Sequence, residues 1–157
     1  MNIFFLDRDV AKCAHAHADQ HVTKMILEYA QLLSTAHYIL DGVQVGYKPT
    51  HKNHPCAVWV RKSSQHYAWL LRLFNELLCE YMIRYPGKIH KTGLLYPTLA
   101  VAPKNLADNG WTDPPQCMPD DSKALDTVAA YRQYYLKHKT QLLNWKINKP
   151  EWVNERV

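Results

Sequence analysis

The segment from residue 17 to residue 35 constrains the fold most, because its polar and apolar residues repeat with the period of an α-helix. The polar positions step by three and four residues: His17, His21, Lys24, Glu28, Gln31 and Thr35. An ordinary solvent-facing helix carries alternating Glu and Lys, whereas this row holds two imidazoles, an amine and a carboxylate. The pattern therefore predicts an amphipathic helix whose polar stripe can support acid–base, nucleophilic or metal chemistry.

Two long helices dominate the predicted fold. The first covers roughly residues 19–40 and ends at Asp41-Gly42, a common helix stop. A short helix, capped by Asp7 or Asp9, precedes it and runs to about His17. The second long helix is capped by Ser63 or Ser64, shows apolar residues at helical spacing, and ends at Pro86-Gly87.

The remaining segments predict short helices and loops, with no hairpin signal. Residues 1–6 are either a short strand or an extended lead-in, and residues 43–62 are expected to form a connector. We expect a helix over about 88–100, a long irregular loop over 102–122, and a last helix from Leu125 or Asp126 to about His138. The whole chain, residues 1–157, is therefore predicted to be one compact all-α domain with long irregular loops.

Composition narrows the class of partner. The chain has 157 residues, of which 47% are hydrophobic and only five are glycine, which favours a compact globular protein. A net charge of +5, together with ten Tyr and five Trp, favours a nucleic-acid partner. No apolar run approaches the roughly 20 residues needed to span a bilayer, and none resembles a secretory signal. We expect a cytoplasmic protein with reduced thiols and no membrane partner; the oligomeric state stays open.

Three basic segments are candidate nucleic-acid surfaces: residues 47–61, 88–92 and 131–139. Each combines cations with aromatic rings or a proline-fixed turn, features that suit phosphates and bases. The candidate contacts, including two from the stripe, are His17, Gln31, Lys52, His54, Arg61, Lys88, His90, Lys91, Tyr134 and Lys137. The first segment can also be an ordinary basic loop. In the last segment Tyr131 is expected to belong to the core, and for Tyr134, Lys137 and Lys139 both a nucleic-acid contact and an ordinary structural role stay open.

Three interpretations of the stripe remain open. It can be a plain polar helix face. It can line a cleft in which Glu28 is a general acid or base whose charge state is set by Lys24 and His21. It can also hold a metal through His17 and His21, with Glu28, His51, His54 or Cys56 completing the ligand set.

Short motifs in this region resemble a known family. Ala18-Asp19-Gln20-His21, with Glu28 seven residues after the histidine, is similar to the N-terminal helix of the pyrimidine-dimer DNA glycosylases of the phage endonuclease V type. Asn53-His54-Pro55 resembles a segment of bacterial members. The longer pattern also resembles small phage proteins of uncharacterised function. The resemblance implies an all-α domain, which would act in the host cytoplasm if phage-encoded.

The resemblance also implies an activity, that of a DNA N-glycosylase with abasic-site lyase activity and no metal or cofactor. In that family the chain's α-amino group attacks C1′ of the damaged nucleotide, an imine forms, and β-elimination breaks the strand. Glu28 would stabilise the ring-opened sugar and move protons, and His21 would contact the DNA backbone.

This chain departs from the family at three places. Asn2 follows the initiator Met where the family exposes a threonine, and its size predicts that Met1 is retained. The nucleophile is then the Met1 α-amine or Lys24. Leu27 stands where the family has an arginine, and the N-terminus lies farther from the motif. The alternatives are a metal-dependent phosphoesterase or nuclease using His17 and His21, or a nucleic-acid-binding accessory protein without chemistry.

Overall fold

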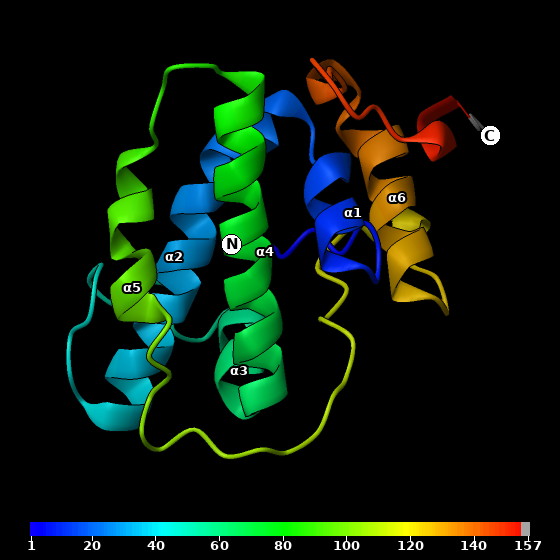
Figure 1. Ribbon diagram of the computed structural model, residues 1–157. Coiled ribbons are helices and arrows are strands. Elements are labelled where there is room, and N and C mark those ends of the chain that lie inside the picture. Colours follow the sequence, from blue (N-terminus) through cyan, green and yellow to red (C-terminus); the bar gives the residue numbers. More distant parts are fainter. Residues whose placement is uncertain (155–157) are drawn as a thin grey trace.

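The protein is built of helices joined by loops, as seen in a computed structural model that describes residues 1–154 (Figure 1). The six α-helices are α1 (Val10–Ala16), α2 (Asp19–Asp41), α3 (Pro55–Lys62), α4 (Ser64–Arg84), α5 (Tyr96–Leu99) and α6 (Thr127–His138). Short 3-10 helices cover Lys91–Leu95, Asp120–Ser122, Thr140–Leu142 and Glu151–Asn154. Residues 1–154 contain no β-strand, so the predicted all-α class is confirmed. Within this part of the chain, no helix is both long enough and apolar enough to cross a membrane.

Local capping signals explain why the long helices begin and end where they do. The side chain of Asp9 accepts a hydrogen bond from the Lys12 amide at the start of α1. Ser63 caps α4 in the same way, and Asp126 caps α6. Gly42, with φ of 69°, takes the left-handed conformation that ends α2. The predicted bounds of these four helices agree with the structure to within one or two residues.

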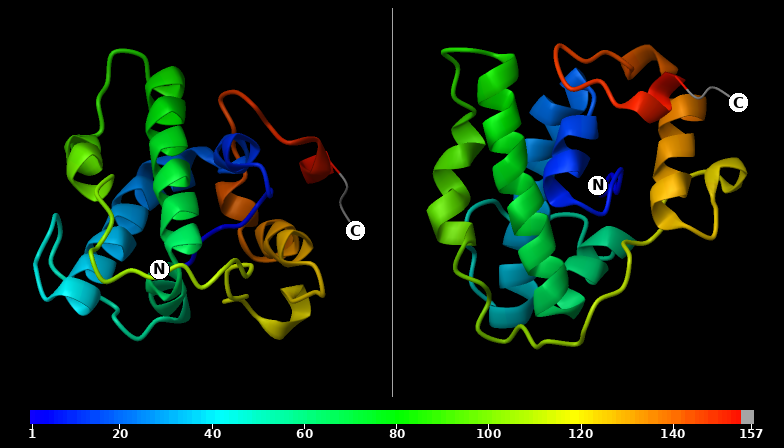
Figure 2. Two further views of the ribbon diagram at one scale, coloured as in Figure 1. Left: turned by 60° about the horizontal axis from the view of Figure 1, so that its bottom comes forward. Right: turned by 45° about the vertical axis from the view of Figure 1, so that its right-hand side comes forward.

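Helices α2 and α4 pack side by side and form the centre of the molecule (Figures 1 and 2). Helix α3 packs across both of them, and α1 packs against α4. Helix α6 lies on the side of α1 that faces away from α4, and the long loop after α5 crosses the molecule to reach it (Figures 1 and 2). Buried apolar residues from all six helices join in one core cluster.

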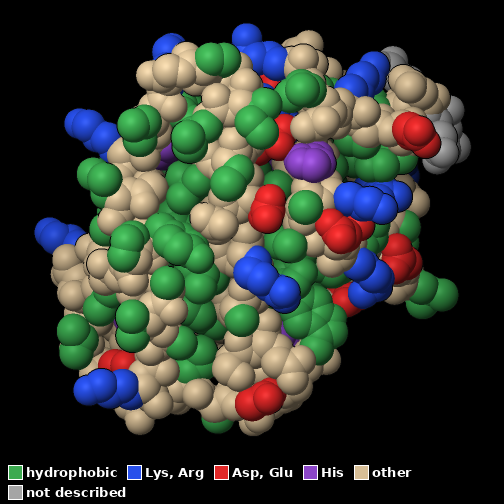
Figure 3. Space-filling model, in the orientation of Figure 1, with side chains coloured by type: hydrophobic (Ala, Val, Ile, Leu, Met, Phe, Trp, Pro, Cys, Tyr) green, Lys and Arg blue, Asp and Glu red, His purple; other side chains and the backbone are tan. Residues whose placement is uncertain are grey.

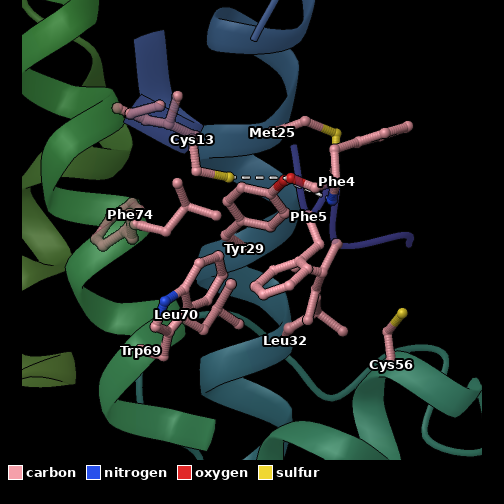
Figure 4. Close-up of a cluster of buried hydrophobic side chains, with 14 of the residues drawn as sticks. Phe4, Phe5, Cys13, Met25, Tyr29, Leu32, Cys56, Trp69, Leu70 and Phe74 are labelled. Atoms are coloured by element: carbon pink, nitrogen blue, oxygen red, sulfur yellow. Dashed lines mark hydrogen bonds between the residues drawn. The ribbon is translucent and has the colours of Figure 1, made fainter. Parts of the chain in front are cut away.

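The N-terminal segment runs through this core, and residues 3–6 are all buried. Phe4 and Phe5 are drawn in the core cluster of Figure 4. Phe4 packs against His21 of α2, with ring centroids 4.4 Å apart, and against Tyr135 of α6. Phe5 packs against Trp69 of α4, at 5.1 Å. The segment is thus a buried lead-in that forms no strand, and it anchors the chain's amino end beside α2.

Two predicted segments differ from the structure. The expected connector at 43–62 contains α3, an eight-residue helix whose short apolar pattern follows a proline. The expected helix over 88–100 is replaced by a 3-10 helix, Lys91–Leu95, and the four-residue α5. Pro97 has no N–H to bond the Gly93 carbonyl four residues earlier, which interrupts a continuous α-helix at this point. The loop predicted at 102–122 is largely irregular, as expected.

Candidate functional site

A small cavity lies where the N-terminal segment, α2 and the end of α6 meet. Its volume is about 200 Å³. Its lining residues are Met1, Asn2, Phe4, His21, Lys24, Met25, Glu28, Tyr134 and Lys139. The four residues predicted to be catalytic, Met1, His21, Lys24 and Glu28, therefore share one cavity with Tyr134.

The Met1 amine and the Glu28 carboxylate form an ion pair in this cavity. The Met1 nitrogen lies 3.3 Å from Glu28 Oε1, and the Met1 and Glu28 side chains are only 4% and 15% exposed. Lys24 Nζ lies 3.7 Å from Glu28 Oε2, but the Lys24 side chain is 69% exposed. The α-amine is thus the enclosed partner of Glu28, and Lys24 reaches it from the solvent side.

Glu28 has one carboxylate oxygen that the protein does not satisfy. Among the described residues, Glu28 Oε2 is the only buried side-chain nitrogen or oxygen without a hydrogen-bond partner. Buried polar atoms are hydrogen-bonded in the great majority of cases, and a catalytic role is one explanation for an exception. The oxygen therefore keeps an unused acceptor position in a residue that lines the cavity.

His21 lines the cavity as a neutral ring. It is 3% exposed, and its Nδ1 lies 2.6 Å from the Tyr135 hydroxyl, which also accepts from the Ala18 amide. The hydroxyl therefore donates its proton to Nδ1. Burial, with positive neighbours adding to it, lowers the pKa of His21 to about 3. The ring is therefore uncharged at neutral pH. His21 does not set the charge state of Glu28 as a neighbouring cation would, which corrects that expectation.

His17 is not part of the site. It follows α1 as its C-cap residue, before α2 begins, and it is fully buried. Its Nδ1 donates to the Cys13 carbonyl at 2.7 Å, and its Nε2 accepts from the Tyr29 hydroxyl at 2.8 Å. Burial lowers the pKa of His17 to about 4. The predictions that His17 continues the helical stripe, contacts DNA or binds a metal with His21 are corrected, because both ring nitrogens are used inside the core.

A buried arginine that the sequence analysis did not single out explains the break before α2. Arg84, 3% exposed, donates to the carbonyls of His15 and His17 at 2.9 and 2.7 Å. It also forms ion pairs with Glu80 and Asp19, both at 3.1 Å. Asp19 of the Ala-Asp-Gln-His motif thus serves the junction of α1 and α2. The signal in the sequence is an ionic i,i+4 pair, Glu80 and Arg84, near the end of α4.

Some of the predicted DNA contacts lie at the cavity or next to it. Tyr134 lines it, and the Lys139 ammonium group lies 5.1 Å from the centroid of the Tyr134 ring. His90 Nε2 donates to the Thr23 carbonyl at 3.1 Å, which places the 88–91 segment beside α2 one residue from Lys24. Lys88 and Lys91 of that segment are exposed. Lys139 belongs to the basic segment 131–139, but nothing in the sequence distinguishes it from the other cations there.

Other predicted contacts are held elsewhere. Lys137 Nζ donates to the Asp121 carbonyl at 2.5 Å, away from the cavity. Arg61 donates to the Lys52 carbonyl at 2.8 Å, so these two form one local surface, and burial lowers the pKa of Arg61. Gln31 is half-buried on α2 and does not line the cavity.

His54 lies near the cavity but does not line it. It is half-buried and caps α3, with Nδ1 accepting from the Cys56 amide at 3.0 Å. Burial lowers its pKa, and the positive N-terminus lowers it further. His54 is thus close enough for the charge of the Met1 amine to affect its pKa, but it is not one of the residues that line the cavity.

The net positive charge of the chain is not spread over every face. In Figure 3, Lys and Arg side chains interleave with Asp and Glu on the right-hand part of the face that Figure 1 shows. The cavity is different, because the Met1 amine, Lys24 and Lys139 outnumber the single carboxylate of Glu28.

No known protein family, curated protein or solved structure matches the chain.

Proposed function

We propose that this protein is a DNA-processing enzyme, an abasic-site lyase with DNA N-glycosylase activity, whose nucleophile is the Met1 α-amine and whose acid–base group is Glu28. The single observation that carries the proposal is the 3.3 Å contact between the Met1 nitrogen and Glu28 Oε1 in the small cavity that both residues line. A nucleophile within hydrogen-bond reach of a base is the general arrangement for covalent catalysis.

The ion pair supplies both groups that the reaction needs. Glu28 takes a proton from the Met1 ammonium group, which frees the lone pair of the amine. The lone pair attacks C1′ of an abasic sugar, and Glu28 returns protons as the ring opens and water leaves, giving an imine. Loss of a proton from C2′ then expels the 3′-phosphate and breaks the strand. On a nucleotide that still carries its base, the same attack displaces the base from C1′.

Met1 and Lys24 differ in their position relative to Glu28. The Met1 nitrogen lies 3.3 Å from Glu28 Oε1, whereas Lys24 Nζ lies 3.7 Å from Glu28 Oε2 and the Lys24 side chain is 69% exposed. These differences favour Met1 as the nucleophile and leave Lys24 to attract phosphate.

The cavity suits the sugar–phosphate part of a nucleic acid. Its volume of about 200 Å³ is below the roughly 300–1,000 Å³ of sites that hold drug-sized ligands. It can hold a sugar ring more readily than a sugar with its base. Lys24 and Lys139 at the lining supply positive charge for the flanking phosphates. Both features favour an abasic site in DNA as the primary substrate.

The experiment is reductive trapping on a duplex oligonucleotide that carries one abasic site. Sodium borohydride reduces an imine to a stable amine, so the wild-type protein is expected to form a covalent adduct and to nick the strand. Glu28→Gln should reduce the yield about 100-fold or more, because positioned acid–base groups contribute about 10²–10⁴-fold. Glu76→Gln, the same change on α4 outside the cavity, is the matched control and should trap like wild type.

Two results would contradict the proposal. Absence of any adduct with the wild-type protein would remove the imine mechanism. Salt-sensitive DNA binding that survives Glu28→Ala, with no strand cleavage by the wild-type protein, would identify a binding protein instead. The metal-dependent nuclease is not proposed, because among the described residues no group of His, Cys, Asp or Glu that includes His17 or His21 converges closely enough to hold an ion.

A further inference from the structure

A second cluster of reactive side chains lies outside the cavity and has no part in the proposed reaction. It consists of His54, Cys56 and Cys117. One ligand atom from each lies within 4.8 Å of the others, and the two sulfurs are 3.9 Å apart. Cys56 is fully buried, whereas His54 and Cys117 are half-buried. Among the described residues, no other group of His, Cys, Asp or Glu converges in this way.

Two separate parts of the fold supply these residues. His54 and Cys56 flank Pro55 at the first turn of α3, where the proline fixes the backbone. Cys117 comes from the loop before α6, 61 residues farther along the chain. Its amide lies 3.4 Å from the Tyr131 hydroxyl, and that hydroxyl donates to the Pro115 carbonyl at 2.5 Å. The cysteine is therefore held in place by the buried face of α6.

We propose that His54, Cys56 and Cys117 bind a thiophilic divalent metal ion, Zn²⁺ in the cell. Two thiolates bound tetrahedrally to zinc at about 2.3 Å lie about 3.8 Å apart, close to the observed sulfur separation of 3.9 Å. A disulfide would require about 2.05 Å between the sulfurs. The sulfur separation therefore fits two ligands of one ion and not a disulfide.

The hydrogen bond of His54 selects the ring atom that binds. Nδ1 accepts from the Cys56 amide, so in the neutral ring Nδ1 carries the lone pair and Nε2 the proton. A metal ion takes the Nδ1 lone pair in place of this single amide bond. A neutral imidazole and two thiolates are one of the donor sets that zinc accepts, with water at the fourth position.

The consequence is a structural link beneath the proposed active site. The ion would join the start of α3 to the loop before α6. The Asn2 side chain donates to the Cys117 carbonyl at 2.7 Å, so the same loop also holds the residue next to Met1. The metal site does not depend on the proposed lyase activity, and its test reads metal binding directly.

The test uses the full chain, reduced and stripped of metal, and titrates it with Co²⁺ as the spectroscopic probe. We expect one ion per chain, thiolate-to-cobalt charge-transfer absorption, tetrahedral d–d bands, and displacement of the cobalt by Zn²⁺. Cys117→Ser and His54→Ala should each weaken Zn²⁺ binding at least 100-fold in competition with a chromophoric chelator. Cys79→Ser, a change at an exposed cysteine outside the cluster, is the matched control and should bind like wild type.

A second measurement does not depend on the variants folding. In the wild-type protein, Zn²⁺ should slow the alkylation of Cys117 by iodoacetamide and leave the alkylation of Cys79 unchanged. The proposal is overturned if no cobalt–thiolate band appears. It is also overturned if Zn²⁺ protects neither cysteine, or if the protein isolates as a Cys56–Cys117 disulfide that, once reduced, still binds no metal.

Discussion

Tyr29 provides the sharpest test of how the core positions the amino end. Its hydroxyl is fully buried, accepts from the Phe4 amide at 3.1 Å and donates to His17 Nε2 at 2.8 Å. Figure 4 shows Tyr29 beside Phe4 and Cys13 in the core. Tyr29→Phe keeps the ring and leaves both partners buried without a hydrogen bond. His17 cannot adapt by moving its proton, because its Nδ1–H is needed by the Cys13 carbonyl.

The expected cost follows from these two lost bonds. A buried donor or acceptor left unsatisfied costs about 1–3 kcal/mol, so the two together should lower the free energy of unfolding by about 2–6 kcal/mol. Urea denaturation measures this, with Tyr38→Phe as the control at a 40% exposed position. The control should change stability by less than about 0.5 kcal/mol. A change that small for Tyr29→Phe would refute the hydrogen-bond scheme.

Further predictions concern the buried charges and imidazoles. The folded-state pKa values of His17 and His21 are about 4 and 3, below the 6.5 of an ordinary histidine. Between pH 6.5 and these values, the two rings bind protons in the unfolded chain but not in the folded protein. The free energy of unfolding should therefore fall as the pH drops from 6.5 toward 4, by on the order of 1.4 kcal/mol per pH unit for each ring. Urea denaturation midpoints that stay constant between pH 6.5 and 4.5 would contradict this. Arg84→Met should destabilise the fold by about 3–5 kcal/mol, because it leaves the buried Glu80 carboxylate without its cation, and Arg84→Met combined with Glu80→Leu should recover part of the loss. Thermal melts of the three proteins check this, and a single variant as stable as wild type would exclude the role given to Arg84.

The parts of the fold that follow local rules could be predicted from the sequence. Asp9, Ser63 and Asp126 are side-chain caps, and Gly42 is a left-handed stop, so the starts of α1, α4 and α6 and the end of α2 follow from residues within one turn of those ends. The convergence of Glu28, Lys24, His21 and Met1 also agrees with the structure. Three of these lie at helical spacing on α2.

The parts that depend on distant contacts could not be predicted. The sequence predicts a break near His17 but not the contact that holds it, since neither glycine nor proline stands there. The chain turns because Arg84, 67 residues away, binds the His17 carbonyl. His17 and His21 therefore have the spacing of two residues on one helix face, although the chain is not helical between Ala16 and Asp19. The pairing of Cys56 with Cys117 is equally invisible to local pattern, because it requires the loop before α6 to reach the start of α3.

Identification of the atom that bonds to DNA tests the central claim most directly. The wild-type protein would be trapped with borohydride on abasic DNA, digested with protease and nuclease, and the modified peptide sequenced by mass spectrometry. The intact mass, measured first, establishes that Met1 is present. The account predicts that the sugar remnant is on the Met1 α-amine, and that the same adduct still forms in Lys24→Ala. A remnant on the Lys24 side chain, or no adduct at all from a protein that retains Met1, would contradict it.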